Sequence, residues 1–141
     1  MLPAQNRMRT SDDFADAIRY GKRSGNRTVV VHVARGTHSE ADLSKVGFVV
    51  SKAVGNSVVR HNLTRKFRHI MRGLLPYLEG RDVVIRANPP AAAATSAELT
   101  EAIITELRRI GLAIPDDSAR ADDEAARVAS VRALRHSRSV Q

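Results

Sequence analysis

The chain has 141 residues, of which 43% are apolar but only 4% aromatic, so it is long enough for one domain with a core made mainly of Val, Ile, Leu and Ala. It contains no cysteine, which excludes disulfide bonds, thiolate metal sites and cysteine nucleophiles. The formal net charge of +8 favours a polyanionic partner; with no membrane-spanning apolar run and no secretory signal at its start, we expect a cytoplasmic protein that does not associate with membranes.

The first predicted element is a helix over residues 11–20. Ser11 is a suitable N-cap, the acidic pair that follows it complements the positive end of the helix dipole, and Gly21 ends the helix. The apolar side chains of this helix, which by default belong to the core, are those of Phe14, Ala17 and Ile18.

Two strands are predicted next. Residues 22–27 are basic and indicate a turn, and the β-branched run at residues 28–35 is typical of a strand. Alternation places Val29, Val31 and Val33 on one face and Thr28, Val30, His32 and Ala34 on the other. Residues 45–51 form the second predicted strand. We expect it to run antiparallel to the first, because the loop at residues 36–44 is short.

The positive charge is concentrated in residues 45–72, which contain seven Lys or Arg residues and no Asp or Glu. A helix is predicted here, with Asn56 or Ser57 as its N-cap. Its apolar arc consists of Val59, Leu63, Phe67, Ile70, Met71 and Leu74, and its basic arc of His61, Arg65, Arg68, His69 and Arg72. Arg60 falls within the apolar arc, in the first turn, from which a long side chain can reach water.

The remaining predicted elements are a strand at residues 82–87 and a helix that begins at a Thr95–Glu98 capping box and ends at Gly111. The order α-β-β-α-β-α indicates an α+β fold, a small sheet packed with helices. If the second and third strands are parallel, they and the basic helix form a β-α-β unit. We expect a folded domain over residues 1–114 and a flexible tail over residues 115–141.

The sequence lacks the motifs of a self-sufficient enzyme. Its five histidines do not have metal-ligand spacing, and it contains no HExxH, phosphate-binding or dinucleotide-binding motif, so we assign no catalytic residue and no metal ligand. The basic helix is more informative. A solvated helix usually alternates acidic with basic residues, whereas this one has no acidic residue, which favours RNA or DNA binding.

An ordered set of segments resembles one known family, the protein subunit of bacterial ribonuclease P. The segments are NRMRTSDDF at residues 6–14, GKR at 21–23, the Val-rich strand at 29–33, VGFVVSKAVGNSVVR at 46–60, the basic helix, DVVIRA at 82–87 and the final amphipathic helix. Together they cover residues 2–112. Two alternatives are a non-catalytic RNA-binding protein, such as a ribosomal or chaperone protein, and a DNA-binding module that inserts the basic helix into a major groove. The second is disfavoured because no short helix precedes the basic one.

The resemblance implies an endoribonuclease subunit whose catalytic groups lie in a partner RNA. That RNA removes the 5′ leader from precursor tRNA with Mg²⁺, which it mainly binds itself, and one protein acts per RNA. The resemblance also implies a further short strand near residues 22–27 and a left-handed β-α-β crossover, against the usual right-handed rule.

Two sets of site residues follow from the resemblance. The residues expected to bind the catalytic RNA are Lys52, Asn56, Arg60, His61, Asn62, Arg65, Lys66, Arg68 and Arg72. The residues expected to form a cleft for the leader are Phe14, Ile18, Val30 and His32. In the family pattern Arg-Asn-Arg-x-Lys-Arg, this chain has His61, Asn62 and Thr64 in place of Asn, Arg and Lys. Two cations are therefore missing, although Lys66 and Arg72 compensate in part and the three replacements can hydrogen-bond.

Overall fold

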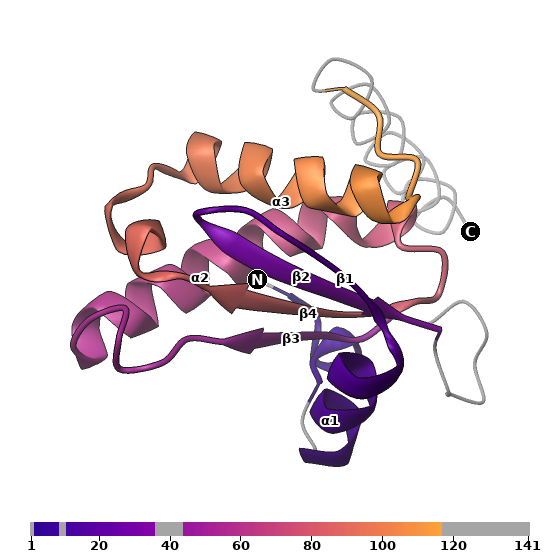
Figure 1. Cartoon of the computed structure of the whole chain (residues 1–141), viewed down its shortest axis with the longest axis horizontal. Coiled ribbons are helices and arrows are strands. Elements are labelled where there is room, and N and C mark those ends of the chain that lie inside the picture. The colour runs from indigo at the N-terminus through magenta and orange to yellow at the C-terminus, as the bar shows by residue number, and fades with distance from the viewer. Residues whose placement is uncertain (1, 9–10, 36–43, 117–141) are drawn as a thin grey trace, which may run out of the picture.

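The computed structural model describes residues 2–8, 11–35 and 44–116 and shows a four-stranded sheet with helices on both faces (Figure 1). The strands are β1 (Lys22–Gly25), β2 (Val29–Ala34), β3 (Val46–Val49) and β4 (Asp82–Ala87), and the α-helices are α1 (Ser11–Tyr20), α2 (Ser57–Leu74) and α3 (Ser96–Ile110). Short 3-10 helices span Ala4–Asn6, Leu75–Tyr77 and Pro89–Ala93. No helix in the described ranges is long and apolar enough to cross a membrane.

The strand order in the sheet is β1-β2-β4-β3. β2 is antiparallel to β1 and to β4, and β3 is parallel to β4. As predicted, β3 runs opposite to β2, but the two strands are not neighbours, because β4 lies between them. β4 is one of the two inner strands of the sheet, and all its residues except Arg86 are buried. The predicted β3–α2–β4 unit is therefore present with parallel strands, and its left-handed crossover stays a prediction.

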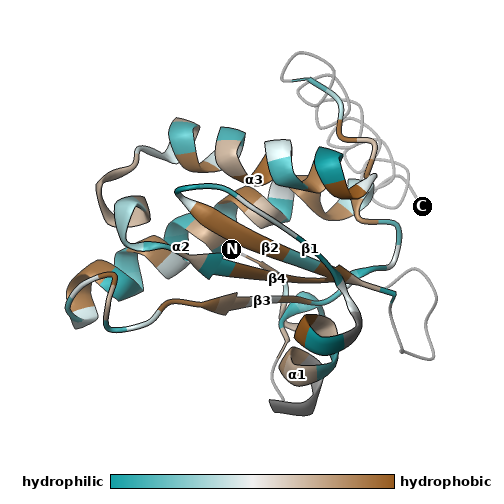
Figure 2. Ribbon diagram, in the orientation of Figure 1, coloured by the Kyte–Doolittle hydropathy of each residue, from teal (hydrophilic) through white to brown (hydrophobic). Residues whose placement is uncertain are grey.

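The two faces of the sheet differ in how they are covered. On one face α2 and α3 enclose the main core (Figure 2), which includes Val29, Val31 and Val33 of β2, as the alternation predicted. On the other face, α1 covers a smaller buried cluster of Met8, Ala17 and Val84. The part of this second face that α1 does not cover forms a cleft.

The ends of α2 and α3 follow the predicted capping chemistry. The Asn56 side chain accepts a hydrogen bond from the Val59 amide at 3.0 Å, which makes Asn56 the N-cap of α2. Thr95 and Glu98 form the reciprocal capping box of α3, and Gly111 ends that helix with a φ of 121°. α1 begins at Ser11, where the sequence predicted the start of a helix.

Residues 22–25 differ from the prediction based on composition. They form strand β1, paired with β2, as the family resemblance implied, instead of part of a turn. The loop predicted at residues 36–44 lies outside the described residues except for Ser44. The predicted tail lies outside them beyond residue 116. Leu112 and Ile114, just after α3, are still buried in the main core.

Candidate nucleic-acid interface

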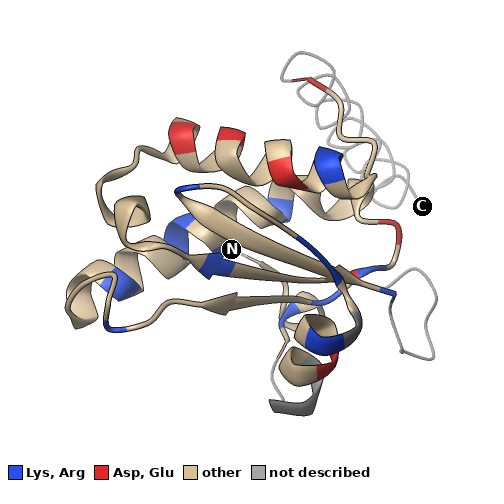
Figure 3. Ribbon diagram, viewed as in Figure 1, with Lys and Arg blue, Asp and Glu red and all other residues tan. Residues whose placement is uncertain are grey.

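The basic arc of α2 faces away from the core. Figure 3 shows Lys and Arg along α2, whereas Asp and Glu gather on α3. The side chains of Lys52, His61, Asn62, Arg65, His69 and Arg72 are exposed, and those of Lys66 and Arg68 are half-buried. The opposite arc is buried at Leu63, Phe67, Ile70, Met71 and Leu74. The predicted division of this helix into a core face and a basic face is confirmed.

A groove lies between α2 and β3, and we call it the α2–β3 groove. It is a hollow of about 410 Å³ lined by Phe48, Val50, Ser57, Arg60, His61, Thr64 and Arg68. Phe48 forms its floor, where its ring stacks on that of Phe67 with centroids 5.7 Å apart. Three of its residues, Phe48, Thr64 and Arg68, also line an adjoining hollow of about 380 Å³ that reaches Arg7.

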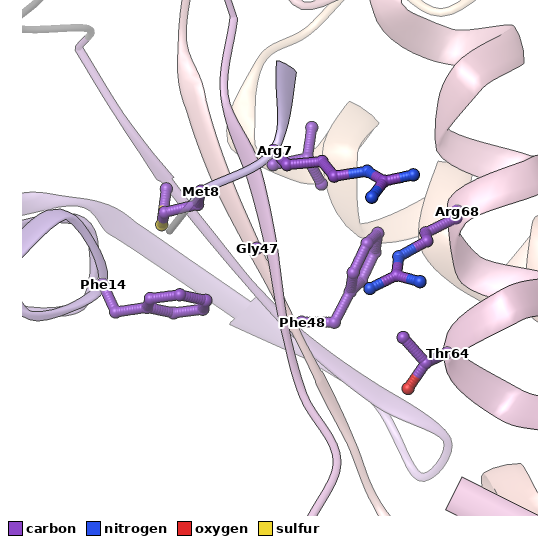
Figure 4. Close-up of a pocket in the computed structure, with 8 residues that line it drawn as sticks. Arg7, Met8, Phe14, Gly47, Phe48, Thr64 and Arg68 are labelled. Carbon is purple, nitrogen blue, oxygen red and sulfur yellow. The ribbon is translucent and has the colours of Figure 1, made fainter. Parts of the chain in front are cut away.

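Arg7 reaches the adjoining hollow because residues 6–8 run along the outer edge of β3. The Met8 amide donates to the Val46 carbonyl at 2.9 Å, and the Asn6 side chain donates to the Ser44 carbonyl at 2.8 Å. Figure 4 shows the guanidinium groups of Arg7 and Arg68 on the same side of β3, next to the Phe48 ring. Arg7 and Phe48 were not among the site residues predicted from the sequence, because their approach to α2 depends on contacts between residues distant in sequence.

Two α2 side chains in the groove have distinct hydrogen-bonding states. The Thr64 hydroxyl donates to the Arg60 carbonyl at 2.9 Å, so in this structure its proton is engaged with the backbone of α2. Arg60 is half-buried, and its Nε has no hydrogen-bond partner in the described structure. A buried donor without an acceptor is unfavourable, so an oxygen atom that reached Arg60 Nε would stabilise it.

A second concave surface lies on the other face of the sheet, and we call it the sheet cleft. Its volume is about 180 Å³, and it is lined by Ile18, Arg23, Val30, His32, Val49, Val84 and Arg86. Strand register explains the arrangement: His32 lies between Arg23 and Val84, and Arg86 lies between Val30 and Val49. Ile18, Val30 and His32 are thus together, as predicted.

Phe14 is not part of the sheet cleft. Its ring lies near Met8 and Gly47 and lines the hollow that reaches Arg7 (Figure 4). Conversely, the predicted cleft residues omitted Arg23 and Arg86. Alternation along β4 could have found Arg86, because it places this residue on the same face as Val84. Arg23 was missed because its segment was interpreted as a turn.

His32 is buried within a cationic cleft. Burial, followed by the positive charges of Arg23 and Arg86, holds the pKa of His32 below its ordinary value of 6.5. Its Nδ1 has no hydrogen-bond partner in the described structure. His32 is therefore a neutral imidazole at neutral pH, under the influence of two nearby positive charges.

In the described part of the chain, no three His, Asp or Glu side chains are grouped closely enough to bind a metal ion. The chemistry visible in both concave surfaces is that of cations, hydrogen-bond donors and apolar side chains. This combination suits an RNA, whose phosphates need cations and whose unpaired bases need apolar contacts.

Comparison with known proteins identifies the family. Residues 2–111 match the family model for ribonuclease P. The chain belongs to the ribonuclease P protein family. It is 45% identical over 112 residues to the ribonuclease P protein component of Nocardioides sp., which covers 79% of this chain and 96% of that protein. It is 50% identical over 113 residues to the ribonuclease P protein component of Beutenbergia cavernae, covering 79% and 93%.

Solved ribonuclease P proteins share the fold. The protein from Thermotoga maritima in complex with 1-(4-fluorophenyl)-2-thiourea has a TM-score of 0.65 at 25% identity and covers 73% of this chain and 98% of its own. The protein from Staphylococcus aureus has a TM-score of 0.68 at 24% identity, with coverage of 76% and 96%. This chain is therefore a ribonuclease P protein component with a role in tRNA 5′ processing, which decides against the ribosomal, chaperone and DNA-binding alternatives.

Proposed function

We propose that this subunit binds two parts of the ribonuclease P reaction complex on two separate surfaces. The exposed face of α2 and the α2–β3 groove bind the catalytic RNA, and the sheet cleft binds the 5′ leader of precursor tRNA. The observation that carries this proposal is that the edge strand β3 separates the two surfaces. Consecutive residues on this edge strand point to opposite faces, so Phe48 faces α2 while Gly47 faces α1 (Figure 4).

The helix surface has the properties that a folded RNA requires. Arg65, Arg68 and Arg72 lie at spacings of three and four residues, without an acidic neighbour on α2. Such cations neutralise phosphates and release counterions, which supplies affinity without reading sequence. The Arg60 Nε, which has no partner in the described structure, and the Arg68 guanidinium next to the Phe48 ring add donors at the groove.

The sheet cleft has the properties that a single strand requires. A double helix is too wide to enter a hollow of this size, whereas an unpaired nucleotide can place its base on apolar side chains. Ile18, Val30 and His32 provide that apolar surface. Because Phe14 packs elsewhere, we assign it to the support of α1 and remove it from the base-contacting residues.

The subunit contributes binding and orientation, and its partner RNA contributes the reacting groups. Mg²⁺, bound mainly by that RNA, supplies the Lewis acid for hydrolysis of the phosphodiester. The chain's cations lower the repulsion between the leader and the RNA and hold the leader in one path, which favours cleavage at one position. We further propose one protein per RNA and a cytoplasmic location.

Reconstitution tests this function. The full chain is mixed with the ribonuclease P RNA of the same organism, and cleavage of precursor tRNA is measured at a low Mg²⁺ concentration at which the RNA alone is slow. We expect a faster release of the leader at the correct 5′ end. Absence of stimulation, with the protein shown to be folded, would falsify the proposal.

A further inference from the structure

Cationic side chains line both concave surfaces of this chain. The α2–β3 groove carries Arg60 and Arg68. The sheet cleft, on the other face, carries Arg23 and Arg86.

Sheet register places these arginines on opposite sides of β2. Arg23 on β1 is opposite His32, and Arg86 on β4 is opposite Val30. β1 and β4 are separated by one strand and the two arginines by two residues along it, so their Cα atoms are roughly 12 Å apart. Both side chains line the same hollow with His32 and Val30 between them.

Exposure to water is a sufficient reason for a charged residue at position 23, but it is a weaker reason for the one at position 86. β1 is an edge strand, and edge strands commonly carry charges that oppose pairing with other chains. β4 is central, and Arg86 is its only exposed residue. Within the described residues, neither guanidinium group has a hydrogen bond or ion pair to a side chain, and His32 Nδ1 also lacks a partner. Both guanidinium groups are exposed, so an anion that enters the cleft can accept charge-assisted hydrogen bonds from them.

We propose that Arg23 and Arg86 bind two backbone phosphates of the single-stranded leader, one on each side of β2, with the intervening base on Val30 and His32. This inference rests on the proposed function, because it assumes that the leader occupies the sheet cleft. The neutral state of His32 suits the role, since an uncharged imidazole can pack against a base while the guanidinium groups hold the phosphates.

The test measures the affinity of the assembled holoenzyme for two substrates. One is precursor tRNA with a leader of several nucleotides, and the other has a leader of one nucleotide. Arg23→Gln, Arg86→Gln and the double variant are compared with Arg27→Gln, which removes an exposed charge from the β1–β2 turn outside the cleft. Binding is measured over a range of salt concentrations.

We expect the slope of log affinity against log salt to become shallower by about 0.7 for each cleft variant and about 1.4 for the double variant, with the long leader only. Arg27→Gln leaves the slope unchanged, and all variants keep wild-type affinity for the catalytic RNA, which shows that they are folded. An unchanged slope, or equal changes for both substrates, overturns the inference.

Two outcomes separate this inference from the proposed function. If the wild-type holoenzyme binds both substrates equally, the leader does not use the protein and both proposals fall. If the wild type prefers the long leader, and Val30→Asp removes this preference while the double arginine variant keeps it, the cleft assignment stands and only the phosphate contacts are wrong.

Discussion

The ring of Phe14 lies directly against the backbone of Gly47, where the sheet has no side chain. A Cβ atom at Gly47 would lie 2.6 Å from Phe14 Cζ and 3.0 Å from Met8 Sδ, both closer than van der Waals contact permits. Gly47 therefore lets α1 approach β3. Because α1 also provides Ile18 to the sheet cleft, this contact positions one wall of the candidate leader site.

Gly47→Ala should lower the free energy of unfolding by about 1–3 kcal/mol, because the added methyl group displaces Phe14 and Met8. Chemical denaturation measures the change. Gly73→Ala is the matched control: a Cβ there has no neighbour within 4 Å, and the substitution should stabilise α2 by about 0.5–1 kcal/mol. Equal effects of the two substitutions would show that Phe14 does not depend on Gly47.

Replacement of Arg65 and Arg68 by Ala should weaken binding to the catalytic RNA and make its salt dependence shallower. The expected change in slope is about 0.7–0.9 for each phosphate that the variant no longer neutralises. Arg86→Gln removes the same charge from the other face and should leave this affinity unchanged. If the slope stays at its wild-type value in the Arg65 and Arg68 variant, α2 is not at the interface.

Glu106→Ala should destabilise the fold by about 3 kcal/mol. Glu106 is fully buried on α3, and its carboxylate accepts hydrogen bonds from Ser24, from Asn26 at 3.2 Å and from Arg109 at 3.0 Å. Its removal frees the β1–β2 hairpin from α3. Glu101→Ala on the same helix removes an exposed side chain and should change stability by less than about 0.5 kcal/mol. A destabilisation at Glu106 no larger than this control would contradict the anchoring role.

His32 should make stability depend on pH. Its pKa is lower in the folded protein than in the unfolded chain, so the unfolded chain binds the proton more readily. The stability that comes from neutral His32 is complete above the unfolded value near 6.5 and is lost as the pH falls through the lower, folded value. Denaturation of the wild type and His32→Gln from pH 7 to pH 5 should show the wild type losing more stability. Parallel curves would contradict this shift.

Local patterns predicted much of this structure, whereas contacts distant in sequence did not follow from them. The 3.6-residue period divided α2 into its two faces, and alternation placed Val29, Val31 and Val33 in the core. The pairing of β3 with β4 was harder to predict from the sequence, because a hairpin between the successive strands β2 and β3 is an equally reasonable expectation. β1 has poor strand propensity and forms because β2 pairs with it and Ser24 bonds to Glu106.

The same distinction applies to the candidate site. Ile18, Val30 and His32 could be grouped through the family resemblance, and the structure brings them together. Phe14 could not be placed, because its position depends on the missing side chain at Gly47. Arg7 lies far from Arg68 in sequence, and the pairing of residues 6–8 with the edge of β3 brings both to the hollow that adjoins the groove.

The central claim, that two surfaces serve two RNA partners, is tested most directly by one variant on each surface. Holoenzyme assembly and affinity for precursor tRNA, with long and one-nucleotide leaders, are measured for Arg65→Ala/Arg68→Ala and for Val30→Asp, which places a carboxylate beside Arg86. We predict that the first variant weakens assembly only and keeps the leader preference once assembled. The second should assemble normally and lose the preference. If either variant weakens both measurements equally, the two surfaces do not act separately.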